Sequence, residues 1–289
     1  MKPDIQAFFD EATNTVTYLV IDPSTRHAAI IDPVLDFDAR NGRTSTHSSD
    51  RVMEAARAAN AVIRWILETH AHADHLSGAA HLRRATGAPL AIGEHIRDVQ
   101  RTFKPLFNAT DLDEDGRQFD RLLADGERLP LGSMEIEVMS TPGHTPACVS
   151  YRIGDNVFVG DTLFMPDYGT ARADFPGGDA GTLFRSIQRL LALPGHTTLW
   201  MCHDYRPPAR TTYEWRTTVA EQRAGNVHVH DGIDEATFVA LRASRDRALA
   251  APQLLLPSIQ VNIRAGELPP PEDDGNRYLK IPVNRLGVG

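Results

Sequence analysis

The sequence contains little cysteine and no long apolar run. Its only two cysteines, Cys148 and Cys202, are too few for a disulfide framework, so we expect free thiols in a reducing compartment. No apolar run approaches the ~20 residues that span a bilayer. Residues 1–15 also lack the basic and then apolar order of a signal peptide. These absences predict a cytoplasmic protein without a membrane partner.

The charge balance excludes a further class of function. The chain has 30 Lys and Arg against 38 Asp and Glu, which gives a net charge of -8, and it has no basic cluster. Such a surface repels a phosphate backbone, so we expect no nucleic-acid partner. At 289 residues, with no linker or internal repeat, residues 1–289 are predicted to form one domain with a sizeable core.

Apolar periodicity and turn residues predict strands and helices that alternate in both halves of the chain. The strands are expected at residues 14–21, 27–32, 61–68, 89–92, 134–140, 148–153 and 156–160, and the helices at 49–60, 75–86, 180–193, 212–223 and 234–250. This order favours two facing sheets with helices outside. From about residue 251 a Pro-rich extension is expected to be irregular but packed, with residues 41–49 an exposed loop near the active edge.

The densest group of metal-ligating residues follows the predicted strand at 61–68. It contains His70, His72, Asp74 and His75, placed where the chain leaves a rigid element. Imidazole and carboxylate ligands suit zinc, iron or manganese rather than calcium or copper(I). A polar turn is the alternative interpretation, but four such ligands within six residues favour a metal site.

Three further candidate ligands, His144, Asp161 and His203, each follow an apolar strand-like run. Glycines at Gly143 and Gly160 allow the chain to turn tightly beside an ion. Each of these signals is weak alone. With the first group they complete a site of seven residues.

These elements together resemble the metallo-β-lactamase superfamily: an HxHxDH motif, then a PGHT histidine, a GD aspartate and a late HD histidine. The resemblance implies an αββα sandwich with metals at one edge between two mixed sheets. A non-catalytic binding or sensor protein is a competing interpretation, but all seven ligand positions are retained.

Within that superfamily, the segment after Asp161 resembles the persulfide dioxygenase (sulfur dioxygenase) branch, which is related to glyoxalase II. The resemblance rests on the RxDF element at Arg172, Asp174 and Phe175, and on His203-Asp204-Tyr205. It is nearest to the bacterial type labelled beta-lactamase-like hydrolase. Better known members have glycine and threonine at the positions of Ala171 and Ala173, so the substrate is less constrained than the chemistry.

The resemblance implies a mononuclear iron(II) held by His70, His144 and Asp161, with open positions for a persulfide sulfur and dioxygen. Glutathione persulfide would then give sulfite and glutathione. The other candidates, His72, Asp74, His75 and His203, would lie beside the iron and hydrogen-bond its ligands or bound water, or would hold a second metal. The same seven side chains could hold two zinc ions and hydrolyse glutathione thioesters as glyoxalase II does, and the sequence leaves both alternatives open.

Three residues are candidates for substrate binding. Arg172 could pair with a glutathione carboxylate, Asp174 could accept from its ammonium group, and Tyr205 could donate a hydrogen bond. A surface Arg–Asp pair is the alternative for the first two. Cys148 and Cys202 are expected to be buried and inert, and a homodimer is a weaker expectation.

Overall fold

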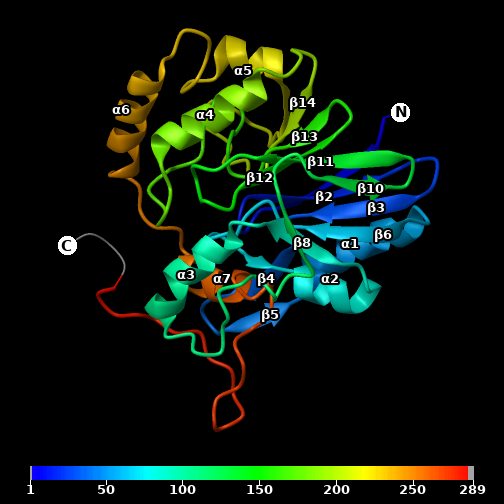
Figure 1. The fold of residues 1–289 in the computed structure, drawn as a ribbon, viewed down its shortest axis with the longest axis vertical. Helices are drawn as coiled ribbons and strands as arrows, with labels where there is room; N and C mark the ends of the chain where they lie inside the picture. Colours follow the sequence, from blue (N-terminus) through cyan, green and yellow to red (C-terminus); the bar gives the residue numbers. More distant parts are fainter. Residues whose placement is uncertain (1, 286–289) are drawn as a thin grey trace.

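Two six-stranded sheets form the centre of the computed structural model, which describes residues 2–285 (Figure 1). The first sheet has the order β1(Asp4–Asp10), β2(Thr15–Ile21), β3(His27–Ile31), β6(Val62–Leu67), β8(Leu90–Gly93), β9(Arg121–Leu123). The second has the order β10(Arg128–Leu131), β11(Met134–Ser140), β12(Val149–Ile153), β13(Asn156–Phe158), β14(Thr198–Trp200), β15(Arg216–Thr218). Both sheets are mixed, because β3, β6, β8 and β9 pair in parallel in the first, and β13 and β14 in the second.

The main core lies between the facing sheets. One buried cluster joins Val20 and Leu67 of the first sheet to Ile136 and Tyr151 of the second. Every residue of β2 is buried, which explains why its sequence is a continuous apolar run with threonines rather than an alternation. The strands are therefore fixed from both faces, and their ends are rigid positions for functional side chains.

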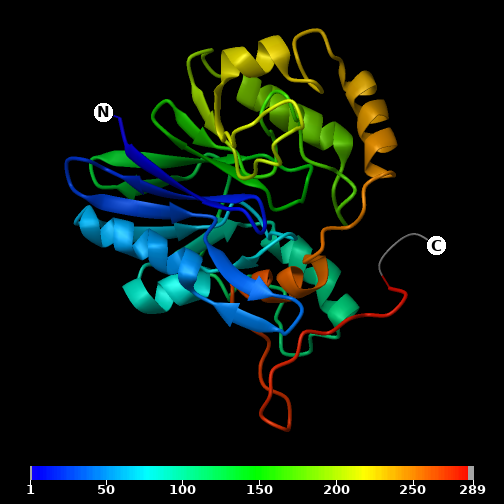
Figure 2. The same cartoon turned by 180° about the vertical axis from the view of Figure 1, so that it is seen from behind.

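Helices cover the outer face of each sheet (Figures 1 and 2). The first sheet carries α1(His47–Ala58), α2(Ala79–Thr86), α3(Ile96–Phe107) and α7(Leu255–Asn262), while the second carries α4(Ala180–Leu191), α5(Val219–Gly225) and α6(Glu235–Asp246). The predicted αββα sandwich of mixed sheets is thus confirmed. A small third sheet of β5(Arg43–Ser45), β4(Val34–Asp38) and β7(Leu76–Ser77) extends the first layer near the open edge.

Several predicted element bounds are wrong, for identifiable local reasons. The helix expected over 212–223 is the strand β15 followed by α5, because Thr218 and Glu221 form a capping box that starts the helix there. The helix expected over 75–86 begins only at Ala79, after the short strand β7. The helix α3 was not predicted, although Ile96, Val99, Phe103 and Phe107 have helical spacing and are buried.

The C-terminal extension is only partly irregular. Residues 255–262 form α7, whose Ile259 packs into the core beneath the first sheet, so the irregular assignment from about residue 251 is wrong for this helix. The segment 41–49 is likewise not a simple loop, since it contains β5 and the start of α1. Within residues 2–285 no helix is both long and apolar enough to cross a bilayer.

Candidate metal centre

Strand ends place all seven predicted ligands at one edge of the sandwich. His70 to His75 follow β6, His144 lies between β11 and β12, Asp161 follows β13, and His203 follows β14. A bridge between Thr15 and His203 connects the two sheets at this edge. Gly143 has φ +134°, and a Cβ there would lie 2.3 Å from the backbone of Leu183, so the turn before His144 requires glycine.

One group of ligand atoms is formed by His70, His144 and Asp161. Their ligand atoms lie within 4.8 Å of one another, and all three side chains are buried. The Oδ2 atom of Asp161 is 3.9 Å from His70 Nε2 and 3.6 Å from His144 Nε2. The structure therefore brings together the three residues that the sequence resemblance grouped as a triad.

A second group lies on the other side of Asp161. His203 Nε2 is 3.3 Å from Asp161 Oδ1 and 3.5 Å from Asp74 Oδ2, and His75 Nδ1 is 3.0 Å from the same Asp74 oxygen. Asp161 thus turns one oxygen to each group. The arrangement resembles a bridging carboxylate between two cation positions, and it keeps the question of one metal or two open.

Unsatisfied buried atoms support a cation at this place. Among the described residues, no hydrogen bond reaches the buried atoms His70 Nε2, His72 Nδ1, His75 Nε2, His203 Nε2 and Asp161 Oδ1. An unpaired buried polar atom costs about 1–3 kcal/mol, and five converging ones are not tolerated without a partner. The donor set of imidazole nitrogen and carboxylate oxygen fits a first-row transition metal or zinc.

Hydrogen bonds on the far side of the rings fix their tautomers. His144 Nδ1 donates to the Arg172 carbonyl at 2.8 Å, and His203 Nδ1 donates to the Asn14 carbonyl at 3.1 Å. A carbonyl can only accept, so each Nε2 keeps a free lone pair for a metal. Burial, with the neighbouring histidines, lowers the pKa of His70 well below its usual value, which also favours the neutral ligand.

Two acidic residues that the sequence analysis did not single out hold His72. Its Nε2 is 3.0 Å from Asp32 Oδ1 and 3.2 Å from Glu68 Oε2, and all three side chains are buried. Burial disfavours charge on this ring, but the two carboxylates outweigh it and raise the pKa of His72 well above its usual value. Each acid directly follows a strand, β3 or β6, which the sequence indicates, but only the structure shows that these strands are parallel neighbours.

The unexpected helix α7 also supports the ligand loop. The Asn262 side-chain amide donates to the carbonyls of His72 and His75 at 2.8 Å, and its oxygen accepts from the Ser77 backbone at 2.8 Å. The side-chain amide of Asn262 therefore holds in place the loop that carries four of the seven candidate ligands. Asn262 is almost 190 residues away in sequence, and no local pattern indicates this contact.

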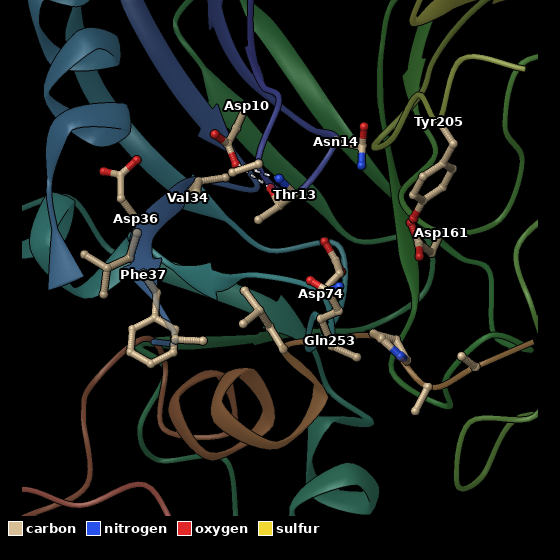
Figure 3. A pocket seen from close by; sticks show the side chains of 18 of the residues that line it. Asp10, Thr13, Asn14, Val34, Asp36, Phe37, Asp74, Asp161, Tyr205 and Gln253 are labelled. Atoms are coloured by element: carbon tan, nitrogen blue, oxygen red, sulfur yellow. Dashed lines mark hydrogen bonds between the residues drawn. The ribbon is translucent and has the colours of Figure 1, made fainter. Parts of the chain in front are cut away.

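The predicted substrate residues Arg172 and Asp174 contact each other. The Arg172 guanidinium donates to both Asp174 oxygens, at 2.6 and 2.7 Å, and to the Ala250 carbonyl at 2.7 Å. Tyr205 lies over His203, with ring centroids 5.5 Å apart, and its side chain is directed toward Asp161 (Figure 3). Of the three, Arg172 and Tyr205 line the cavity described next.

A cavity of about 1180 Å³ opens onto the metal-ligating residues. Asp74, His144 and Asp161 form part of its lining, between the β4–β5 hairpin and the aromatic side chains of Phe164, Tyr168 and Tyr205. In Figure 3, Asp74 lies between Asp161 and the hairpin residue Phe37. Residues 41 and 43–45 line the cavity too, so the prediction that this segment lies near the active edge is confirmed.

The two cysteines are buried, as predicted. Burial raises the pKa of Cys148 to about 12 and that of Cys202 well above its usual value. Cys202 Sγ is 3.5 Å from Asp32, so its thiol proton is directed to a carboxylate. Neither thiol has the character of a nucleophile.

Buried histidines and aspartates at the open edge of an αββα sandwich define a metalloprotein. A family model described as the metallo-beta-lactamase superfamily matches residues 11–203. The chain therefore belongs to this superfamily.

Individual relatives show which members of the superfamily this chain is similar to. Glyoxylase B2 of Dictyostelium discoideum is 50% identical, with 99% of this chain and 98% of that protein covered. The human mitochondrial persulfide dioxygenase ETHE1 is 28% identical, with coverages of 91% and 88%. A crystal structure of ETHE1 from Myxococcus xanthus is 28% identical and superposes with a TM-score of 0.73, covering 91% of this chain and 100% of that one.

Proposed function

We propose that this protein is an iron(II)-dependent dioxygenase that oxidises glutathione persulfide to sulfite and glutathione. The reaction combines one persulfide, one dioxygen and one water, breaks the sulfur–sulfur bond, and releases glutathione, sulfite and two protons. Dioxygen accepts the four electrons that the two sulfur atoms lose. Two oxygen atoms of sulfite derive from dioxygen and one from water.

The observation that carries this proposal is the compact group of His70, His144 and Asp161. Two imidazoles and one carboxylate are the ligand set of non-haem iron(II) oxygenases, which leave positions open for substrate and dioxygen. The Nε2 atom of His72 contacts Asp32 and Glu68 instead of joining this group. The likeness to the ETHE1 proteins in sequence and in fold supports the same reaction.

The residues of the chain have separable roles in this scheme. His70, His144 and Asp161 would hold iron(II), which supplies the one-electron chemistry that a persulfide and dioxygen require. The Arg172 carbonyl orients His144, and the Thr69 hydroxyl, which donates to Asp32, accepts from His70 Nδ1 at 3.0 Å. These contacts set ring orientation before substrate enters.

The same scheme assigns the cavity walls to substrate binding. The Tyr205 hydroxyl, directed toward Asp161, would donate to the bound sulfur compound, and burial raises the pKa of this phenol so that it keeps its proton. Arg172 and Asp174 remain proposed substrate contacts through the donors and acceptors that their mutual ion pair leaves free. Phe164 and Tyr168 would exclude bulk water from the sulfur.

Metal analysis combined with oxygen uptake tests the proposal. Protein loaded anaerobically with iron(II) is expected to consume one dioxygen per glutathione persulfide and to release sulfite, and the His144→Ala variant to lose both. A matched control is His196→Ala, an exposed histidine outside the cavity, which should keep full activity. Iron-loaded protein that consumes no oxygen with glutathione persulfide would refute the proposal.

A second candidate function is a dinuclear zinc hydrolase of glutathione thioesters. It is favoured by the second ligand group, where the Nε2 atoms of His75 and His203 are buried without hydrogen bonds, and by the 50% identity to Glyoxylase B2. Two bound zinc ions and thiol release from S-lactoylglutathione without oxygen would establish it. His203→Ala separates the candidates, because it removes a ligand of the second group only.

A further inference from the structure

Equal numbers of acidic and basic side chains line the cavity over the metal-ligating residues. Some of them bind a partner within the chain, and others do not. Five aspartates and five arginines line it: Asp10, Asp36, Asp38, Asp74, Asp161, Arg40, Arg43, Arg172, Arg242 and Arg245. Which of these charges are already satisfied decides what the cavity attracts.

The three aspartates outside the metal group accept hydrogen bonds from neutral backbone and side-chain groups of the chain. Asp10 accepts from the backbone and hydroxyl of Thr13, at 3.1 and 2.6 Å. Asp36 accepts from the backbone and hydroxyl of Ser48, at 3.0 and 2.6 Å. Asp38 accepts from the backbone of residue 40 and the side chain of residue 41 in the hairpin turn. Their oxygens therefore already accept from neutral donors, although each carboxylate keeps its negative charge.

The arginines divide into two sets. Arg172 pairs with Asp174, and the buried Arg242 pairs with Asp246. Among residues 2–285, the guanidinium groups of Arg40, Arg43 and Arg245 have neither a hydrogen bond nor an ion pair, although each lines the cavity. Within the described residues, these three guanidinium groups are thus donors on the cavity walls that are free to bind a ligand, in a chain whose net charge is -8.

The elements that carry these arginines lie on opposite sides of the site. Arg40 and Arg43 belong to the β4–β5 hairpin beside the first sheet, and Arg245 lies near the end of α6, which packs on α4 over the second sheet (Figure 1). The metal-ligating residues lie at the edge between the two layers. An anion that reaches both walls must therefore pass over the metal group.

We propose that Arg43 and Arg245 determine substrate specificity by each binding one carboxylate of a thiol compound with two carboxylates, so that its central sulfur lies over the metal group. The guanidinium group of Arg40 adds a positive charge to the hairpin side of the cavity. A tripeptide is about 10 Å long when extended, with its carboxylates at the two ends and the sulfur between them. A guanidinium can bind each carboxylate with two parallel hydrogen bonds.

This inference rests on the proposed function for the reaction, but it makes a separate statement about recognition. It assigns selectivity to the hairpin and α6 rather than to the Arg172–Asp174 pair alone. Persulfides of neutral thiols, such as 2-mercaptoethanol, should react with a higher KM and a similar kcat, because they lack both carboxylates but present the same sulfur.

Equilibrium binding tests recognition without turnover. S-methylglutathione, which carries both carboxylates and no reactive sulfur, is titrated calorimetrically into metal-loaded protein. Arg43→Ala and Arg245→Ala are each expected to weaken binding about tenfold or more, and the double variant further. The matched controls are Arg51→Ala on α1 and Arg247→Ala beside α6, two exposed arginines outside the cavity, which should stay within about twofold of the unchanged protein.

A second probe tests whether binding depends on the carboxylate charges of the ligand or on its shape. The diethyl ester of S-methylglutathione lacks both carboxylate charges, so it should bind equally to the unchanged protein and to both cavity variants. Equal binding of S-methylglutathione by all six proteins would overturn the inference, as would the absence of binding to the unchanged protein at millimolar concentration. If binding depends on these arginines while iron-loaded protein consumes no oxygen, recognition stands and only the proposed reaction fails.

Discussion

A buried ion pair on α6 supports the metal centre from outside, and its removal gives a sharp prediction. Arg242 and Asp246 lie one helical turn apart, with exposed fractions of 2% and 7%, and are hydrogen-bonded to each other. Asp246 also accepts from the Ala173 backbone at 3.0 Å, and Arg242 donates to the Thr170 carbonyl at 3.3 Å. The pair thus fixes the loop whose Arg172 carbonyl orients His144.

Replacing Arg242 by Met leaves the Asp246 carboxylate buried without its cation. Breaking a buried pair in this way costs about 3–5 kcal/mol, whereas an apolar replacement of both partners avoids the isolated charge. We therefore expect Arg242→Met to lower the free energy of unfolding by about 4 kcal/mol. Arg242→Met combined with Asp246→Leu should recover part of that loss, limited by the Ala173 N–H that is then left unpaired.

Urea unfolding of the unchanged protein, both single variants and the double variant gives the coupling energy directly. Metal affinity measured on the same set should fall by up to about tenfold in Arg242→Met, because the support of His144 is loosened. A loss of less than 1 kcal/mol for Arg242→Met would show that the pair is solvated in solution and that the loop is held by other contacts.

Three further results are expected. Chelation of the metal should lower Tm by roughly 8 °C in calorimetry, because a ligand at a thousandfold its Kd contributes about 4 kcal/mol; an unchanged Tm would contradict a cation at the buried ligand atoms. Burial, with the charges of Arg242 and Arg245, lowers the pKa of His228 to about 4. Between pH 6.5 and 4 the unfolded chain therefore binds more protons than the folded chain. The contribution of neutral His228 to the free energy of unfolding is fully present above pH 6.5 and falls by on the order of 2 kcal/mol as the pH is lowered to 4. Urea unfolding across this range should show that slope, and His228→Gln should reduce it. Ellman's reagent at pH 8 should label neither Cys148 nor Cys202 in the folded protein and both after unfolding, since burial raises both pKa values; rapid labelling of either would show that the edge opens.

Local sequence patterns predicted much of the fold. The strand β11 was predicted with its observed bounds, and α4 differs by two residues at its end, because apolar periodicity reports burial directly. Predictions were wrong where a short local signal outweighed periodicity, as at Thr218, where the capping box starts α5. They were also wrong for α7, because Pro257 lies inside a helix that tertiary packing stabilises.

The sequence predicted the seven candidate ligands that the structure gathers at one edge, since each lies in a short motif directly after a strand. Asp32 and Glu68 were missed because their importance comes from pairing with His72 across two strands, which is a property of the sheet order. The Arg172–Asp174 pair shows the same limit. The residue types indicated a guanidinium that could bind a substrate carboxylate, and only the structure showed that Arg172 already pairs with Asp174.

The sequence by itself indicated the candidate ligands, the strand ends that carry them and the family, because each of these signals lies in a short motif of adjacent residues. Only the tertiary structure decided how the site is enclosed. The β4–β5 hairpin lies about 200 residues before the end of α6, and Asn262 lies almost 190 residues after the loop that it contacts; these segments meet because the two layers close on a shared core. Long-range packing of this kind has no periodicity in the sequence, so the specificity of the cavity is visible only in three dimensions.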